Sequence, residues 1–377
     1  MIFMIKKKVI IAMSGGVDSS VAAWLLIKQN YQVEGLFMKN WEEDNTNNYC
    51  HAKQDLHDAM SICRQLSIPL HKINFSFEYW EYVFKHFLHE YKLGRTPNPD
   101  ILCNKIIKFK YFMNFAFNYL KADFISTGHY ARCKKIKNQF YLLTSIDKNK
   151  DQSYFLYTLK SQQLKNIIFP IGGLNKYEVR NIARKLNFTN AKKKDSTGIC
   201  FIGERKFVTF LNKYLKSNIG NITDIYGNIL GQHKGLIHYT IGQRKNIGIG
   251  GLKNYCGGAW YVYKKDLLNN TLIVVQEKNN LYLFSIGLIA KDINWINKIL
   301  DISQKLTIKT RYRQKKISCY IISFIKTKKI KVYFKKPISS ITPGQSVVFY
   351  LRHVCLGGGI IEKSIPLINF SNNRIDY

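Results

Sequence analysis

Length, composition and charge narrow the class of protein. The chain has 377 residues, 46% of them hydrophobic, and a formal net charge of +34 at pH 7. This hydrophobic fraction is enough for packed cores, and only 7 prolines argue against long disordered linkers. No apolar run approaches the length of a membrane span and no signal peptide is predicted, so we expect a cytoplasmic protein without a membrane partner. The charge favours nucleic acid as the partner, although AT-rich coding, which favours lysine, explains part of it.

The first 200 residues predict a doubly wound, parallel α/β domain. An apolar run at 9–13 precedes a glycine loop, a helical pattern to about residue 30 and a second strand at 32–38. Further elements follow: helices at about 52–66, 82–91 and 105–120, a strand at 70–74, and a strand from 123 into a glycine turn at 128. Ligands bind at the carboxyl ends of strands in such sheets. The glycines after the first strand therefore mark the expected ligand site.

The pattern changes after about residue 201, where glycine turns separate short strands, and it becomes all-β from about 285. Apolar residues alternate with lysine and arginine in KLTIKTRYR (305–313) and in KIKVYF (329–334). One strand face would then be buried and the other basic and exposed. Closure into a small β-barrel removes exposed strand edges. We expect domains at 1–205, 206–283 (β-rich) and 284–377 (the barrel).

The glycine loop SGGVDSS, residues 14–20, indicates phosphate binding. It fits neither the Walker A pattern nor the dinucleotide pattern GxGxxG. Its glycines permit close backbone approach, and the following helix offers amide donors, although the same residues also occur in ordinary turns and N-caps. Asp18 would repel bound phosphates unless a cation lay between them, so we expect Mg²⁺ to arrive with the nucleotide. No tightly bound metal or organic cofactor is expected.

Two of the eight cysteines lie in segments where a reactive thiol is expected. No pair forms CxxC, which argues against a zinc knuckle and favours reduced thiols. Cys103 follows two prolines and Cys200 follows a Ser-Thr-Gly turn, so both are predicted in loops, near lysines that would raise the thiolate fraction. Burial as a small apolar side chain is the alternative for each. The stretch 49–63, rich in cysteine and histidine, matches no zinc pattern, so no metal site is expected there.

A set of motifs occurs in order from residue 12 to about 362. These motifs are AMSGGVDSS, EGLFMKNW, TPNPDILCN, TGHYA, NKDQSYFLY, DSTGICFIGERKF, GQRKNIGIGG, KTRYRQ, TPGQSVVFY and CLGGGIIE. The first resembles the PP-loop of the N-type ATP pyrophosphatases, and the set resembles the bacterial tRNA-specific 2-thiouridylases. This resemblance implies replacement of O2 of the wobble uridine of tRNA by sulfur, with ATP converted to AMP and pyrophosphate.

The resemblance also implies roles for single residues. Cys103 corresponds to the nucleophile and Cys200 to the persulfide carrier, and Asp100 is our candidate for proton transfer. Residues that would bind the target base are Asn98, Pro99 and Asp100. Residues that would line the ATP site are Ala12, Met13, Ser14, Gly15, Gly16, Val17, Asp18, Ser19, Met38 and Gly128, with alanine at 12 where the family pattern has glycine. Residues that would contact tRNA are His129, Lys150, Asp151, Gln152, Arg311, Tyr312 and Gln345.

The expected chemistry joins the two cysteines. A persulfide on Cys200 would attack C2 of the adenylated uracil, and Cys103 would either free sulfide from Cys200 or form a transient Cys103–Cys200 disulfide. A persulfide-carrying relay protein or a cysteine desulfurase must supply the sulfur. Two alternatives stay open: another PP-loop enzyme acting on tRNA, such as a lysidine synthase with its amine nucleophile, and a non-catalytic RNA-binding protein.

Overall fold

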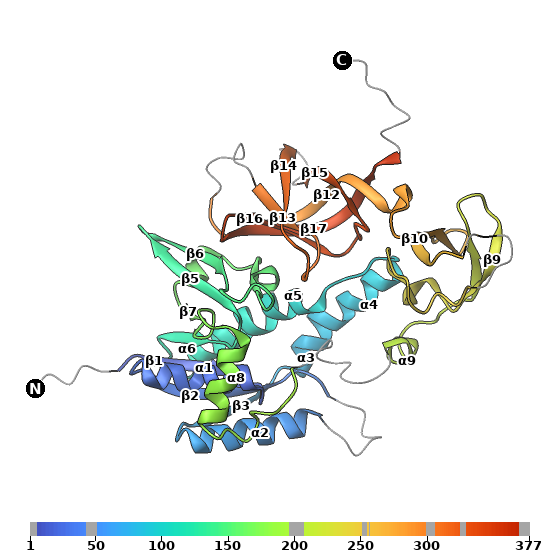
Figure 1. Cartoon of the computed structure of the whole chain (residues 1–377). Helices are drawn as coiled ribbons and strands as arrows, with labels where there is room; N and C mark the ends of the chain where they lie inside the picture. Colours follow the sequence, from blue (N-terminus) through green and yellow to red (C-terminus); the bar gives the residue numbers. More distant parts are fainter. Residues whose placement is uncertain are drawn as a thin grey trace, which may run out of the picture.

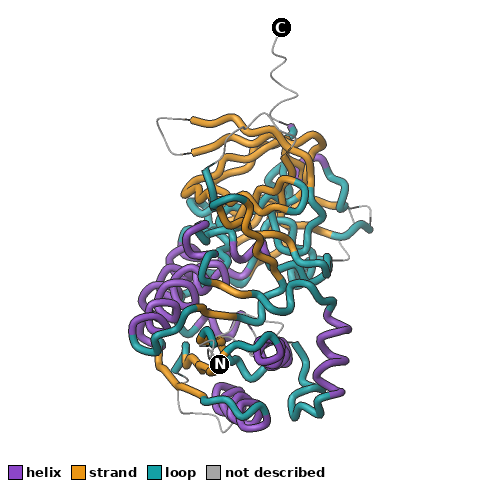
Figure 2. The backbone as a smooth tube through the Cα atoms, turned by 90° about the vertical axis from the view of Figure 1, so that its left-hand side faces the viewer, coloured by secondary structure: helices purple, strands orange, loops and turns teal. Residues whose placement is uncertain are grey.

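The computed structural model contains a parallel α/β domain, a small β domain and a closed β-barrel (Figure 1). It describes residues 6–42, 51–195, 207–250, 255, 257–298, 306–324 and 329–368. Figure 2 shows the strands of the barrel at one end of the molecule and the helical layers at the other. The predicted order of a doubly wound sheet followed by β-rich parts is confirmed.

The first domain is built on a five-stranded sheet in which every neighbouring pair of strands is parallel. The spatial order β3-β2-β1-β4-β7 puts β1 in the centre, beside the point where the winding direction reverses. The strands are β1 (Lys8–Ala12), β2 (Gln32–Lys39), β3 (Leu70–Asn74), β4 (Phe124–Ser126) and β7 (Ile167–Ile168). The glycine loop leaves the carboxyl end of β1, where such sheets bind ligands.

Helices cover both faces of this sheet, because successive side chains of a buried strand point to opposite sides. Val9 and Ile11 pack in one apolar cluster with α1 (Val17–Lys28), α2 (His51–Gln65) and α8 (Lys176–Lys185). Ile10 and Ile125 pack in a second cluster on the other face. The helical segments of that face are α3 (Ser76–Tyr79), η1 (Trp80–Phe84), α4 (Lys85–Lys92), α5 (Pro99–Cys103), η2 (Asn104–Phe112) and α6 (Met113–Asn118).

The helix predicted at 105–120 begins earlier, at Pro99. Asn98 has extended backbone angles, and its side-chain oxygen accepts a hydrogen bond of 3.1 Å from the backbone N–H of Asp100. Proline is well suited to the first helical position, since its missing N–H would have no partner there. The loop predicted around Cys103 is therefore wrong: Cys103 is the last residue of α5.

The central domain is a four-stranded sheet in the order β10-β11-β8-β9. Ile222, Val262 and Leu272 form its apolar centre. The domain contacts the first domain through the Thr96 and Thr240 hydroxyl oxygens, 3.2 Å apart. Its elements are α9 (Phe207–Asn212), β8 (Gly220–Thr223), β9 (Ile229–His233), η4 (Leu236–His238), β10 (Trp260–Asp266) and β11 (Thr271–Gln276).

The last domain is a six-stranded antiparallel barrel, closed by pairing of its first and last strands. The barrel strands are β12 (Phe284–Trp295), β13 (Leu306–Lys309), β14 (Ile317–Phe324), β15 (Lys329–Ser339), β16 (Ser346–Leu351) and β17 (Val354–Pro366), preceded by η5 (Leu281–Leu283). The alternation predicted for KIKVYF is confirmed, since Ile330, Val332 and Phe334 are buried. The predicted C-terminal barrel is confirmed as well.

A hairpin of the first domain, β5 (Ala131–Ile136) and β6 (Gln139–Thr144), extends the barrel sheet. Leu142 and Leu143 of β6 pair with β17 in antiparallel register. The segment after the hairpin forms η3 (Ser153–Leu156) and α7 (Ser161–Leu164). The sequence analysis did not predict this hairpin, which fastens the barrel to the α/β domain.

The predicted exposed basic face of 305–313 is wrong at Lys309. The Lys309 side chain is only 9% exposed, and its ammonium lies 3.3 Å from the carboxylate of Asp151, which is 4% exposed. Period-two alternation assumes that one strand face meets water. Here the outer face of β13 meets the segment that follows the β5–β6 hairpin, so the lysine is buried with a partner.

Candidate active site

The glycine loop has the geometry of a phosphate-binding turn. Gly15 has a left-handed backbone with φ of 71°, and a Cβ at this position would lie 2.3 Å from the backbone oxygen of Asp55. Gly16 is the N-cap of α1 and has no side chain with which to bond the first-turn N–H groups. Those N–H groups and the positive end of the helix dipole are therefore available to an anion.

Serine hydroxyls fix the shape of the loop. The Ser19 hydroxyl donates to the backbone oxygen of Gly16 at 2.9 Å, and the Ser20 hydroxyl donates to the same oxygen at 3.0 Å. The Ser14 N–H donates to the Ser19 hydroxyl oxygen at 3.3 Å. The loop is thus held before any nucleotide binds.

Other residues expected at the ATP site surround this loop. A Cβ on Gly128 would lie 2.8 Å from the backbone nitrogen of Ser19, so the turn after β4 packs directly against the start of α1. The N–H of Met13 donates to the oxygen of Leu36 at 2.9 Å, and Met38 lies two residues further along β2, toward its carboxyl end. The structure brings together the segment 12–19, Met38 and Gly128 at this edge of the sheet.

Asp18 is paired with groups that the sequence analysis missed. The Tyr130 hydroxyl donates to Asp18 Oδ1 at 2.9 Å, and Lys176 Nζ lies 2.7 Å from the same oxygen. A cation beside Asp18 was expected, and here the chain itself supplies one. No local pattern could reveal this pair, because Lys176 is 158 positions from Asp18 in the sequence.

Lys176 also contacts Asp195, on which three cationic side chains converge. The nitrogen–oxygen distances to the Asp195 carboxylate are 2.7 Å for Lys176, 2.7 Å for Arg180 and 2.6 Å for Lys150. Burial by itself would raise the pKa of Asp195, but hydrogen bonds from Lys150 and Lys176 outweigh it and lower the pKa to about 2. Asp195 is therefore ionised at neutral pH. It is also the last described residue before 196–206, and Cys200 lies outside the described residues.

Lys193 is one of the lysines before Cys200 that were expected to raise the thiolate fraction of that cysteine. Its ammonium instead contacts α2 and the glycine loop. Its ammonium lies 2.7 Å from a carboxylate oxygen of Asp55 and 2.5 Å from one of Asp58, and it donates to the backbone oxygen of Gly15 at 3.3 Å. Burial lowers the pKa of Lys193, but the hydrogen bonds to Asp55 and Asp58 outweigh it and give a net rise. Lys193 therefore joins the glycine loop to α2.

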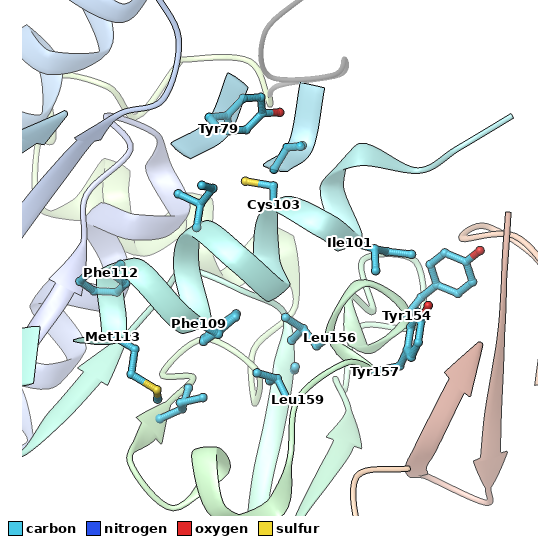
Figure 3. Packing of buried hydrophobic residues seen from close by; sticks show 14 of the residues in the cluster. Tyr79, Ile101, Cys103, Phe109, Phe112, Met113, Tyr154, Leu156, Tyr157 and Leu159 are labelled. Atoms are coloured by element: carbon cyan, nitrogen blue, oxygen red, sulfur yellow. The ribbon is translucent and has the colours of Figure 1, made fainter. Parts of the chain in front are cut away.

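Cys103 is buried rather than exposed in a loop. The residue is 3% exposed and belongs to the apolar cluster that also contains Tyr79, Phe109 and Phe112 (Figure 3). In the part of the chain that the structure describes there is no disulfide. The position of Cys103 is therefore buried, and the loop environment predicted for it is wrong.

Asp100 lies one helical turn before Cys103. Burial raises the pKa of its carboxyl group, and the charge of Lys108 opposes this rise in part. Asn98 and Pro99 form the N-cap and first position of the same short helix. The three residues expected to bind the target base thus sit together at the start of α5, one turn from the thiol.

Most residues expected to contact tRNA make internal contacts here. Asp151 pairs with Lys309 and Lys150 pairs with Asp195, as described above. The Gln152 side-chain oxygen accepts from the N–H of Tyr130 at 2.9 Å, and the side-chain N–H of Gln345 donates to the oxygen of Thr96 at 2.8 Å. These side chains hold domains and loops together in the absence of RNA.

Three of the expected tRNA contacts differ in exposure. His129 is buried and lies 2.8 Å from the Thr127 hydroxyl. Burial, with a smaller contribution from the charge of Lys108, lowers the pKa of His129 well below its ordinary value, so the ring is neutral. Tyr312 is half-buried and packs on Phe155, with ring centroids 4.4 Å apart, whereas Arg311 is exposed.

The described ranges hold no group of three or more histidine, cysteine, aspartate or glutamate side chains that could bind a metal ion. Among the helices of those same ranges, none is long and apolar enough to cross a membrane.

Family models match nearly the whole chain in three blocks. Residues 7–204 match the model described as tRNA methyl transferase HUP domain, and 208–276 match its PRC-barrel domain. Residues 285–361 match the model described as aminomethyltransferase beta-barrel domain.

Curated relatives are similar over almost their full length. The tRNA-specific 2-thiouridylase MnmA of Buchnera aphidicola subsp. Acyrthosiphon pisum is 58% identical over 98% of this chain and 100% of its own. The protein of the same description from Klebsiella pneumoniae subsp. pneumoniae is 54% identical, over 96% of this chain and 98% of its own. Identity at this level over the full length, together with the three matching domains, shows that this chain belongs to the family of tRNA-specific 2-thiouridylases, which are tRNA sulfurtransferases.

Proposed function

We propose that this chain uses ATP to replace O2 of the wobble uridine of tRNA by sulfur. The observation that carries the proposal is the glycine loop at the carboxyl end of the central strand, with an N-cap that lacks a side chain and with Gly128 packed against it. This geometry suits a departing pyrophosphate. The names of the relatives and the net charge of +34 support tRNA as the substrate.

Activation of the uracil comes first in the proposed reaction. The C2 carbonyl is urea-like and its oxygen is a poor leaving group. ATP, bound with Mg²⁺, supplies an adenylyl group to O2, and the bond from the α to the β phosphate breaks with release of pyrophosphate. The N–H groups at the start of α1 would hold that pyrophosphate, and Asp18 would orient the cation.

Sulfur transfer then needs both cysteines. The terminal sulfur of a Cys200 persulfide attacks C2, the C2–O2 bond breaks, and AMP leaves with the former O2. The Cys103 thiolate attacks the Cys200 sulfur of the resulting mixed disulfide, which frees 2-thiouridine and forms a Cys103–Cys200 disulfide. Alternatively, Cys103 attacks the persulfide first, and the sulfide released attacks C2. In both routes a cellular thiol must reduce the disulfide before a relay protein or desulfurase reloads Cys200.

Asp100 is the proposed proton-transfer group of this sequence. Its raised pKa makes the carboxylate a stronger base than an ordinary aspartate, and it lies one turn before Cys103. A cysteine attacks as its thiolate, so a nearby base that removes the Cys103 proton would promote the attack. The target base must leave its stack to reach this site, which costs a few kcal/mol.

The experiment that tests the proposal is incubation of the protein with tRNA, ATP and a persulfide donor, followed by mass spectrometry of the nucleosides. We expect 2-thiouridine from the wild type, none from Cys103→Ser or Cys200→Ser, and unchanged tRNA affinity for both variants. Cys133→Ser replaces a half-buried cysteine that has no role in the proposed reaction. It is the matched control and should retain activity.

The alternatives are distinguished by a second measurement on the same mixture, the tRNA-dependent release of pyrophosphate from ATP. A lysidine-synthase-like enzyme would stay active after either cysteine substitution, because its nucleophile is an amine on its substrate. A non-catalytic RNA-binding protein would show no tRNA-dependent release of pyrophosphate from ATP.

A further inference from the structure

Lys176 links two acidic residues of the site, and the proposed reaction gives it no role so far. It is the first residue of α8, and its ammonium lies 2.7 Å from Oδ1 of Asp18 and 2.7 Å from Oδ1 of Asp195. The side chain is 13% exposed, so the ammonium is largely shielded from water but still accessible to a ligand. The backbone N–H of Lys176 donates to Asp147 at 2.9 Å, which fixes the start of the helix.

The position of this ammonium suits a phosphate. Asp18 belongs to the first turn of α1, whose N–H groups form the anion site. A cation 2.7 Å from Asp18 is therefore within reach of an anion held there. A lysine ammonium has three N–H donors. Within the described ranges, Asp18 and Asp195 take two of them, which leaves the third for a phosphate oxygen.

The segment that ends at Asp195 is fastened to the glycine loop at several points. The Asn190 side-chain N–H₂ donates to the Gly15 oxygen at 3.0 Å and to the Ser20 hydroxyl at 2.9 Å. Arg180, one turn after Lys176 on α8, donates to the Lys193 oxygen at 3.1 Å and to the Asp195 carboxylate at 2.7 Å. This segment continues in the chain directly to 196–206, which contains Cys200.

We propose that Lys176 is a phosphate-binding residue of the ATP site, and that its ion pair with Asp195 couples the nucleotide loop to the segment leading to Cys200. The inference rests on the proposed ATP-dependent function and adds a residue to it. When pyrophosphate occupies the loop with Mg²⁺, Asp18 would hold the cation and would so release Lys176. Lys176 then bonds a phosphate oxygen and keeps its bond to Asp195. The segment 190–195 is thereby held against a filled loop.

The test measures equilibrium binding of ATP, inorganic pyrophosphate and AMP, each with Mg²⁺, to the purified full-length protein. Loss of a hydrogen bond to a charged group costs about 1.5–3 kcal/mol, which is about a 10- to 100-fold loss of affinity. We expect Lys176→Met to lose this much for ATP and pyrophosphate and nothing for AMP, which lacks the two outer phosphates. Lys176→Arg keeps the charge and should recover most of the affinity. Lys185→Met, at an exposed lysine of the same helix, is the control.

Two outcomes would overturn the assignment: unchanged ATP affinity in Lys176→Met, or an equal loss for AMP, which would indicate a merely structural role. If repulsion between Asp18 and Asp195 unfolds the single variant, Lys176→Met/Asp195→Asn removes that repulsion and must show the same selective loss. These measurements need neither tRNA nor sulfur. A wild type that binds ATP but makes no 2-thiouridine would therefore refute the proposed function and leave the phosphate-binding role standing.

The coupling to Cys200 has its own readout. The rate of Cys200 alkylation is followed by peptide mass spectrometry with and without pyrophosphate. We expect pyrophosphate to change this rate in the wild type and in Lys185→Met but not in Lys176→Met. The same response in all three proteins would refute the coupling.

Discussion

The buried pair of Lys309 and Asp151 allows a quantitative test of how the barrel is fixed to the α/β domain. The two side chains are 9% and 4% exposed, and their charged atoms lie 3.3 Å apart. Lys309→Met would leave the Asp151 carboxylate buried, with the N–H groups of Ser145 and Ser153 at 3.3 and 3.2 Å as its hydrogen-bond donors among the described residues and with the charge of Lys316 nearby. Removing one partner of a buried ion pair costs about 3–5 kcal/mol, because the other charge stays uncompensated.

Native-state hydrogen exchange of the β13 amides measures this loss without requiring that the whole chain unfold in one step. A loss of about 3 kcal/mol or more corresponds to exchange about 100-fold faster or more. Lys85→Met is the control, because its partner Glu81 and the lysine itself are 32% and 56% exposed. Such exposed pairs contribute about 1 kcal/mol at most.

The double variant Lys309→Met/Asp151→Asn separates the uncompensated charge from ordinary packing. With both charges removed, stability should return close to that of the wild type, since a buried ion pair adds little net stability over neutral groups. The reasoning is refuted if Lys309→Met exchanges at the wild-type rate, or if the double variant is as unstable as the single one.

Three further predictions concern activity. Gly128→Ala puts a methyl group 2.8 Å from the Ser19 nitrogen and should displace the start of α1, with a fall of about 10²-fold in kcat/KM for ATP and unchanged tRNA affinity; wild-type kinetics would contradict it. Burial raises the pKa of Asp100, so the wild-type rate should increase with pH over a range above the ordinary aspartate pKa of about 4. Asp100→Asn should abolish this increase, and an increase centred on the ordinary aspartate pKa would exclude Asp100 as the base. A plot of log tRNA affinity against log salt should have a steep negative slope, and a flat plot would show that the charge of +34 is not used on RNA.

The sequence predicted well those elements whose signals are local. The strand Leu70–Asn74 was predicted with its observed limits, and the strands β1 and β2 to within a residue. For β1 the signal is a continuous apolar run, which is typical of a buried strand. The start of α5 was missed although Asn98 and Pro99 form a familiar N-cap and first-position pair. The two prolines were interpreted as loop residues, which also led to the wrong environment for Cys103.

The features that the sequence did not predict depend on contacts between distant parts of the chain. Pairing of β6 with β17 and burial of Lys309 against Asp151 require the barrel to dock on the first domain. The Asp18–Lys176 pair depends likewise on how α8 lies over α1. A pattern of apolar and polar residues carries no information on which distant side chains meet.

The β5–β6 hairpin also has a consequence for biosynthesis. The Cys355 thiol of β17 donates to the backbone oxygen of Ser153, in the segment after the hairpin, across 202 sequence positions. At about 5–20 residues per second, the ribosome makes β17 some 10–40 seconds after β6. During that interval the nascent chain carries an unpaired strand edge, a known starting point for aggregation. A chain that ended before residue 354 would keep this edge open permanently.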